Sequence, residues 1–122
     1  MKWLLALSIA LLAVPVGSAE PDAITRTEVA HLLKYLETSS CQFQRNGAWY
    51  PPARAASHLN QKYEYMLKKG LVTNTESFIV GAASASSASG KPYAVKCGNA
   101  AAVPSAVWLQ EELRRFRTRK GE

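Results

Sequence analysis

Hydrophobic residues recur at helical spacing in four segments of the chain, which predicts four helices. The first helix begins at a capping-box pattern, Thr25 with Glu28, and ends near Thr38. The third begins at a similar pattern, Thr73 with Glu76. The residues predicted to face the core are, helix by helix, Val29, Leu32, Leu33 and Leu36; Ala55, Leu59, Tyr63, Met66 and Leu67; Phe78, Ile79 and Ala82; and Leu109, Leu113 and Phe116.

Two other segments alternate apolar and polar residues, which is typical of β-strands. The segment "CQFQRNGAWY" begins at Cys41 and alternates on both sides of Asn46-Gly47, the strongest short signal for a β-hairpin. The segment "PYAVKC" places Tyr93, Val95 and Cys97 on one face. Together they predict three short strands, two in the hairpin and one later in the chain.

Residues 1–19 have the pattern of a secretory signal peptide: a positive start, a long apolar run and small residues that end at Ala19. A membrane anchor is the alternative, but the run is shorter than the roughly 20 residues that span a bilayer, and Pro15 interrupts it. We therefore expect cleavage between Ala19 and Glu20, a periplasmic location, and no transmembrane segment after cleavage. The remaining residues, 20–122, are expected to form a single domain.

The chain has two cysteines, Cys41 and Cys97. In an oxidising compartment such a pair is expected to form one disulfide, which would add about 4 kcal/mol of stability by closing a long loop. Free or metal-binding thiols are the alternative, disfavoured by the wide spacing and by only two histidines, so no metal site is predicted. The predicted fold class is α+β, mainly α: about four helices, a small three-stranded antiparallel sheet and one disulfide.

The bridge would hold the strand that ends at Cys97 beside the hairpin, because bridged cysteines have Cα atoms within about 7 Å. The Ser-rich stretch "SASSASGKPY", residues 84–93, must then span from the third helix to this tethered strand. It is either an ordered binding loop or a solvated surface loop, and its composition leaves both open. As a binding loop, its candidate contact residues are Ser87, Ser89, Gly90, Lys91 and Tyr93.

The chain is basic, with a net charge of +6. Arg54, His58 and Lys62 recur every four residues on the second helix and form one stripe. The stripe is either a solvated basic face or a cationic binding ledge with an imidazole that titrates near neutrality. A second basic cluster, near the C-terminus, contains Arg114, Arg115, Arg117, Arg119 and Lys120 and is expected to be a frayed tail. The partners considered are an envelope protein and an anionic envelope polymer; nucleic acid does not suit the compartment.

Four stretches together resemble the YfeK-like proteins, secreted bacterial proteins that carry a domain of unknown function. These stretches are "CQFQRNGAWY", "ASHLNQKY", "TESFIVGAASASSASGKPYAVKC" and "WLQEELRRFR". The resemblance implies a small single-domain periplasmic protein of Gram-negative type with a bridged cysteine pair, and it implies no activity. The family often has an acidic residue at the position of Arg54, so His58, Lys62 and the segment 89–93 are better candidates for a shared site.

These observations favour a non-catalytic binding or inhibitor module that presents the Ser-rich loop 84–93. Ser89-Gly90-Lys91-Pro92-Tyr93 is similar in spacing to the Ser-Gly-x-x-Tyr loops of periplasmic lysozyme inhibitors, although those inhibitors are β-barrels. The alternative is a small envelope hydrolase that uses His58 with a loop serine. Phosphate-loop and Ser-x-x-Lys patterns are absent from the sequence, and no catalytic residue or cofactor is assigned.

Overall fold

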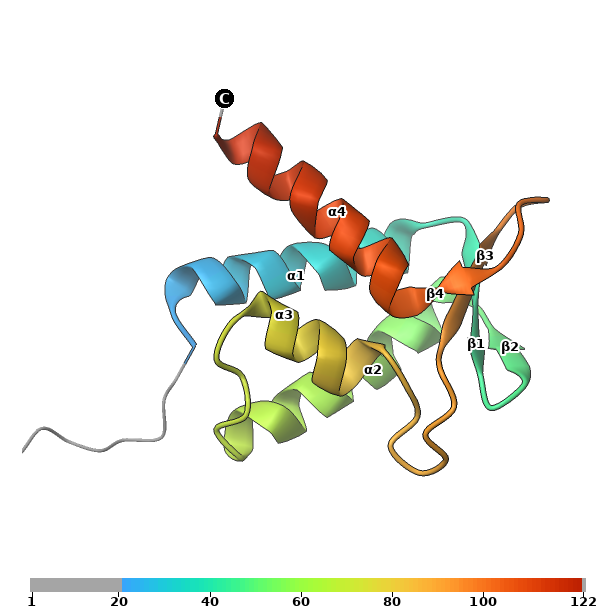
Figure 1. The fold of residues 1–122 in the computed structure, drawn as a ribbon, viewed down its shortest axis with the longest axis horizontal. Helices are drawn as coiled ribbons and strands as arrows, with labels where there is room; N and C mark the ends of the chain where they lie inside the picture. The colour runs from blue at the N-terminus through green and yellow to red at the C-terminus, as the bar shows by residue number, and fades with distance from the viewer. Residues whose placement is uncertain (1–20, 122) are drawn as a thin grey trace, which may run out of the picture.

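The computed structural model describes residues 21–121, and the predicted signal peptide lies outside them. In chain order the elements are α1 (Ala23–Thr38), β1 (Cys41–Arg45), β2 (Ala48–Tyr50), α2 (Pro52–Lys68), α3 (Thr75–Phe78), the π-helical turn η1 (Ile79–Ala83), β3 (Ala94–Cys97), β4 (Val103–Pro104) and α4 (Ser105–Lys120). Figure 1 shows the sheet at one end of the molecule, with the helices packed together at the other. Within the described part of the chain, every helix is too short or too polar to cross a bilayer.

The N-cap of helix α1 lies three residues before the predicted one, at Asp22 instead of Thr25. The Asp22 side chain accepts a hydrogen bond of 2.7 Å from the backbone N–H of Thr25 and caps the helix. The predicted capping box of Thr25 and Glu28 is therefore wrong. Both residues are buried inside the helix, and Glu28 instead accepts hydrogen bonds from Arg117 of α4.

Helix α3 is capped by Asn74, one residue after the predicted Thr73. The Asn74 side chain accepts from the backbone N–H of Ser77 at 2.8 Å, and the two residues form a reciprocal capping box. The predicted capping box was displaced by one residue, because the side chain that bonds back to the N-cap backbone belongs to Ser77 rather than to Glu76. Glu76 is free to bind Arg117 instead.

The sheet has four antiparallel strands in the order β2-β1-β3-β4, so the prediction of three was wrong by one. The missed strand, β4, is only two residues long and pairs Val103 with Val95 and Pro104 with Ala94. Two residues are too few to show an alternating pattern. Pro104 also has no N–H to donate, which suits the sheet edge on which it lies.

The predicted disulfide between Cys41 and Cys97 is confirmed. The two residues lie directly opposite each other in the β1–β3 ladder, with their Cα atoms 4.2 Å apart. The bridge therefore joins the first strand of the sheet to a strand 56 residues later. It places the end of the Ser-rich loop beside the hairpin, as the sequence predicts.

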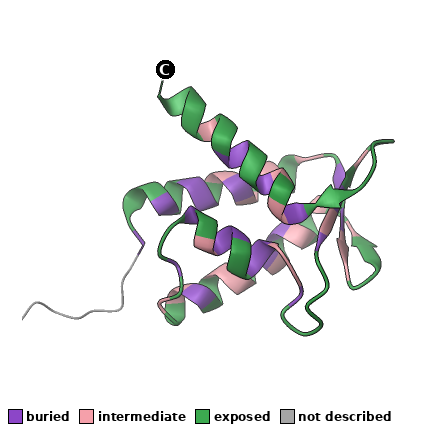
Figure 2. Cartoon of the chain, in the orientation of Figure 1, coloured by how far each residue is buried: buried purple, intermediate pink, exposed green. Residues whose placement is uncertain are grey.

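The core lies between the helices and the inner face of the sheet, where buried positions from all these elements meet (Figure 2). Most of the predicted core residues are confirmed as buried: Val29, Leu32, Leu36, Leu59, Met66, Phe78, Ile79, Ala82, Leu109 and Leu113. Four others are partly buried against that core: Leu33, Ala55, Tyr63 and Leu67. Tyr93 and Val95 of the later strand are also buried.

The basic C-terminal cluster is part of a helix that continues to Lys120, rather than a frayed tail. Arg117 Nε lies 2.7 Å from Glu28 Oε2, and Arg117 also binds Glu76. Thr75 donates a further hydrogen bond of 2.6 Å to Glu28. Arg117 therefore compensates a carboxylate that the core packing buries.

A second buried carboxylate, Glu112, lies within α4 itself. His31 Nε2 approaches its Oε2 to 2.6 Å, Arg115 Nε lies 2.9 Å from its Oε1, and Arg119 also contacts it. Burial raises the pKa of Glu112, but the hydrogen bonds from these three residues outweigh it and hold the pKa below its usual value. Three arginines of α4 are thus paired with glutamates of the same domain.

Glu28→Gln is expected to lower the free energy of unfolding at pH 7 by about 1–3 kcal/mol, because donors of Arg117 and Thr75 lose a charged acceptor. The hydrogen bond from Arg117 holds the pKa of Glu28 below its ordinary value of 4.5, so its stabilisation is present above that pH and lost as the pH falls through the lowered pKa. Urea unfolding should be measured over the pH range in which Glu28 titrates. The decrease in the free energy of unfolding on acidification should be smaller in Glu28→Gln than in the wild type. The exposed Glu37→Gln, on the same helix, is the control and should show the wild-type decrease.

Candidate ligand-binding pocket

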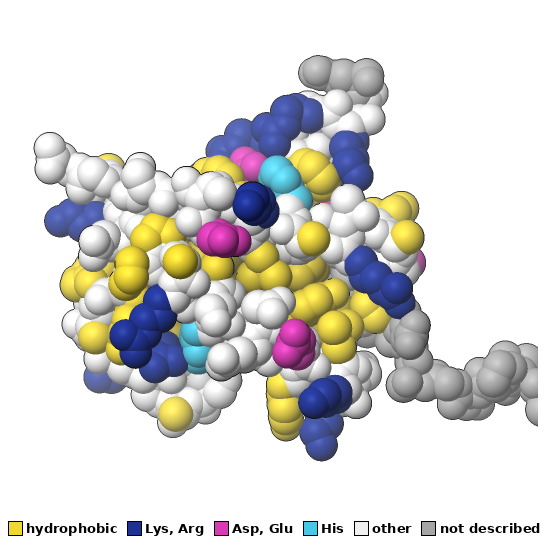
Figure 3. All heavy atoms as spheres, turned by 180° about the vertical axis from the view of Figure 1, so that it is seen from behind, with side chains coloured by type: hydrophobic (Ala, Val, Ile, Leu, Met, Phe, Trp, Pro, Cys, Tyr) yellow, Lys and Arg dark blue, Asp and Glu magenta, His cyan; other side chains and the backbone are white. Residues whose placement is uncertain are grey.

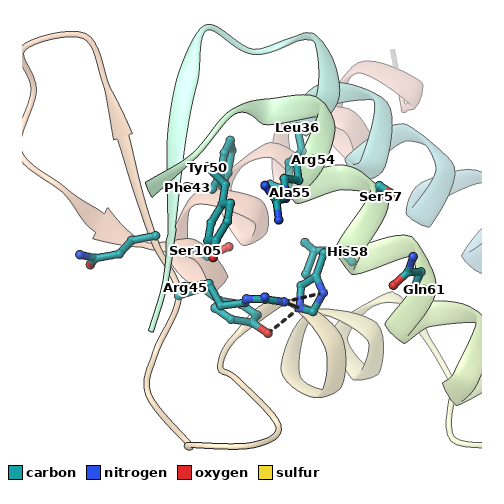
Figure 4. Close-up of a pocket in the computed structure, with 13 residues that line it drawn as sticks. Leu36, Phe43, Arg45, Tyr50, Arg54, Ala55, Ser57, His58, Gln61 and Ser105 are labelled. Atoms are coloured by element: carbon teal, nitrogen blue, oxygen red, sulfur yellow. Dashed lines mark hydrogen bonds between the residues drawn. The ribbon is translucent and has the colours of Figure 1, made fainter. Parts of the chain in front are cut away.

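A cavity of about 290 Å³ lies between the β1–β2 hairpin, α2 and Tyr93. Its apolar floor is formed by Leu36, Phe43 and Leu59, which belong to the core. Its rim is polar and carries Arg45, Tyr50, Arg54, Ser57, His58 and Gln61 (Figure 4). Small-molecule sites have volumes of roughly 300–1,000 Å³, so this pocket suits a compact ligand.

The hairpin aims two of these side chains at the pocket. Its turn, Asn46-Gly47, has positive φ angles of 52° and 80°, as a tight two-residue hairpin requires. Phe43 pairs with Tyr50 across the hairpin, and Arg45 lies two residues beyond Phe43 on the same face of β1. Arg45 and Tyr50 therefore face α2 rather than the exposed side of the sheet.

Arg45 reaches across to His58 of α2, as Figure 4 shows. Its Nη1 lies 2.9 Å from His58 Nδ1 and 3.2 Å from Nε2, and Nε2 lies 3.0 Å from the Tyr93 hydroxyl. One arrangement of a neutral imidazole that fits these contacts has Nδ1 accepting from Arg45 and Nε2–H donating to Tyr93. His58 thus joins residues from three elements that are distant in sequence.

Lys62 lies one turn further along α2 and completes this cluster. Its Nζ donates to the Tyr93 hydroxyl at 3.2 Å and to the carbonyl oxygen of Ala85 at 2.9 Å. The same Nζ lies 5.0 Å from the centre of the Tyr93 ring, a cation–π distance. With Nε2 of His58 protonated, Tyr93 accepts from both His58 and Lys62, and its own hydroxyl proton is available to another acceptor.

The positive charges of the cluster act on the groups around them. Burial lowers the pKa of His58, and the charges of Arg45 and Lys62 lower it further. Burial also lowers the pKa of Lys62, again with a contribution from Arg45. Burial raises the pKa of Tyr93. The positive charge of this cluster therefore belongs to Arg45 and Lys62, and both disfavour the protonated form of His58.

Arg54 contributes a second guanidinium at the rim. Arg54 Cζ lies 4.9 Å from the centre of the Tyr50 ring, and Arg45 Cζ lies 5.5 Å from the same centre. Among the residues that the structure describes, no carboxylate lines the pocket or pairs with either arginine. Figure 3 shows Lys and Arg side chains gathered beside a histidine at one end of the face in view, with the acidic side chains elsewhere.

A model of a protein family matches residues 23–117, and its description is "Family of unknown function (DUF5329)". This chain belongs to that family. The match agrees with the expected domain of unknown function, but it gives no support to the YfeK-like naming or to a Gram-negative origin. Comparison of the DUF5329 chain with curated proteins and with solved structures gives no match.

The Ser-rich loop of the DUF5329 domain has its own hydrogen bonds. Backbone bonds run from Ser86 N to Lys91 O and from Gly90 N to Ser86 O, each at 2.8–2.9 Å. The Ser89 hydroxyl donates to Asn46 Oδ1 in the hairpin turn, and Ser86 is buried. The loop is therefore braced against the hairpin at Asn46 and against α2 through Lys62.

Of the predicted site residues, three come together at one point of the DUF5329 domain: His58, Lys62 and Tyr93. Ser89 contacts the neighbouring hairpin turn, whereas Ser87, Gly90 and Lys91 are exposed on the loop. Tyr50 was missed, although the hairpin alternation that places it opposite Phe43 was visible in the sequence. The part of the chain that the structure describes contains no cluster of His, Cys, Asp and Glu suited to a metal ion.

Proposed function

We propose that this DUF5329 protein is a non-catalytic periplasmic binding module, and that its binding surface combines the pocket with the adjacent Ser-rich loop 84–93. The observation that carries the proposal is the preformed cavity, whose polar rim surrounds an apolar floor. The disulfide fits export to an oxidising compartment, which the predicted signal peptide would direct.

The loop supports this proposal by its position. Lys62 and Tyr93 link it to the pocket, and Asn46 links it to the hairpin, so its exposed residues are held beside the pocket rim. A partner that enters the pocket would thus also meet Ser87 and Lys91, both of which are exposed. Binding residues often lie on such loops, where a rigid scaffold holds them.

The hydrolase alternative has less support from the geometry. A histidine that activates a serine needs that hydroxyl within hydrogen-bond reach. The hydrogen bonds of His58 among the described residues are with Arg45 and Tyr93, and Ser89 contacts Asn46 instead. Burial, with the charges of Arg45 and Lys62, also lowers the pKa of His58, which weakens it as a base.

The proposal is tested by filling the pocket. Ala55 lines the cavity on α2, so Ala55→Trp should occupy part of its volume. Ala53→Trp, exposed on the same helix and outside the cavity, is the matched control. Thermal unfolding of all three proteins should be measured against a small-molecule library. A ligand at about 100 times its Kd stabilises the folded state by about 2.7 kcal/mol, and this should appear as a higher Tm.

We expect compounds that raise the Tm of the wild type and of Ala53→Trp but not of Ala55→Trp. If every compound acts equally on all three proteins, the pocket is not a binding site and the proposal is wrong. Hydrolysis of chromogenic ester substrates that disappears in His58→Ala would instead favour the hydrolase.

A further inference from the structure

The polar rim of the pocket carries two guanidinium groups, and no carboxylate of the described residues lines it. Arg45 and Arg54 carry fixed charges, and both guanidiniums lie against the ring of Tyr50. The Tyr93 hydroxyl accepts from Lys62 and, with Nε2 of His58 protonated, keeps its own proton to donate. Such a surface matches a ligand that supplies acceptors.

Among the residues that the structure describes, no carboxylate compensates the charge of these two arginines. Elsewhere in the described structure, Arg115, Arg117 and Arg119 each bind a glutamate. The guanidinium of Arg45 instead donates to a neutral imidazole, and that of Arg54 lies over an aromatic ring. Like charges near a shared ring repel each other, and an anion between them would relieve that repulsion. A planar guanidinium can bind a carboxylate or phosphate through two parallel hydrogen bonds.

The floor of the pocket decides what the rest of the ligand must be. Leu36, Phe43 and Leu59 are buried core residues that also line the cavity, and Ala55 adds a methyl group at its side. These side chains offer no hydrogen bonds to hydroxyl groups or to a second phosphate oxygen. An apolar body placed on them would be removed from water, which is favourable by about 25 cal/mol per Å².

We propose that the pocket binds a small monocarboxylate with a compact apolar body. The carboxylate lies between Arg45 and Arg54, near the Tyr93 hydroxyl, and the apolar body lies on Leu36, Phe43 and Leu59. This inference rests on the proposed binding function and names the ligand class for the same pocket. Inorganic phosphate has the charge but no apolar body, so it should bind more weakly.

The experiment uses four probes that separate charge from apolar contact: hexanoate, 1-hexanol, hexylamine and inorganic phosphate. Isothermal titration calorimetry with the purified protein should give a Kd for hexanoate below about 1 mM. Hexanol and phosphate should each bind at least tenfold more weakly, because hexanol lacks the negative charge and phosphate lacks the apolar body. Hexylamine should show no binding, since its charge repels the two arginines.

Two substitutions test the arginines separately. Arg54→Gln and Arg45→Gln should each weaken hexanoate binding at least tenfold. Arg54 is exposed and its contact is with one ring, so its variant tests the proposal even if Arg45→Gln fails to fold. Arg114→Gln removes the same charge from an exposed position on α4 and should leave the Kd unchanged.

The outcomes distinguish the ligand class from the binding function. If hexanol binds as tightly as hexanoate in the wild type but not in Ala55→Trp, the pocket binds ligands but the carboxylate assignment is wrong. If hexanoate does not bind, or binds Arg54→Gln and Ala55→Trp as tightly as the wild type, the inference is overturned. The thermal-unfolding screen against the small-molecule library then tests independently whether the pocket binds any ligand.

Discussion

Reduction of the Cys41–Cys97 disulfide is expected to lower the free energy of unfolding by about 4 kcal/mol. The bridge spans 56 residues of sequence, so the reduced chain gains much conformational freedom when it unfolds. Small domains have total stabilities of about 5–15 kcal/mol, so this loss would be a large fraction of the whole. Urea unfolding with and without a reducing agent measures it directly.

The control is a double variant, Cys41→Ala with Cys97→Ala, which has no bridge to reduce. It should have the stability of the reduced wild type and should not respond to the reducing agent. If reduction changes the wild-type stability by less than about 1 kcal/mol, the chain-entropy account of this bridge is wrong.

Tyr93→Ala is expected to cost about 3–5 kcal/mol, as truncation of a buried aromatic side chain does. The Tyr93 side chain lies under the Ser-rich loop and contacts both His58 and Lys62. Its backbone also joins the loop to α4, because its N–H donates to Ser84 O and its carbonyl accepts from Ser105 N. The substitution keeps these backbone hydrogen bonds but removes the contacts of the ring and hydroxyl with His58 and Lys62, and chemical denaturation should show the loss.

Tyr93→Phe is the matched control, since it keeps the ring and removes only the hydroxyl. It should cost about 0.5–1.5 kcal/mol, the usual contribution of a hydrogen bond. Equal effects of the two substitutions would mean that the hydroxyl, rather than ring burial, stabilises this part of the fold.

The arrangement explains why one tyrosine matters to both stability and binding. Tyr93 is part of the core, yet its hydroxyl reaches the pocket and orders two basic side chains of α2. The disulfide contributes indirectly, because it fixes β3 next to β1, and Tyr93 directly precedes β3 in the chain. A loss of the bridge should therefore also loosen the pocket.

Local patterns in the sequence determined most of the secondary structure of this protein. Two of these patterns act over a few residues: the helical spacing of Leu32 and Leu36, and the Asn46-Gly47 turn. The disulfide could be predicted because the chain has only two cysteines, so each has one possible partner. Those predictions are confirmed. The caps were misplaced by a few residues because Asp22 and Asn74 compete with nearby residues of similar capping strength.

Only the tertiary structure decided which polar residues meet. His58 and Tyr93 are 35 residues apart, and Glu28 and Arg117 are 89 residues apart, so no short-range pattern links them. Strand β4 is likewise defined by its pairing with β3 rather than by its own two residues. The basic residues look alike in the sequence, but the packing gives Arg117 a buried carboxylate and leaves Arg45 beside a neutral histidine. The difference arises because burial and distance, which set the energy of a charge, are properties of the assembled fold.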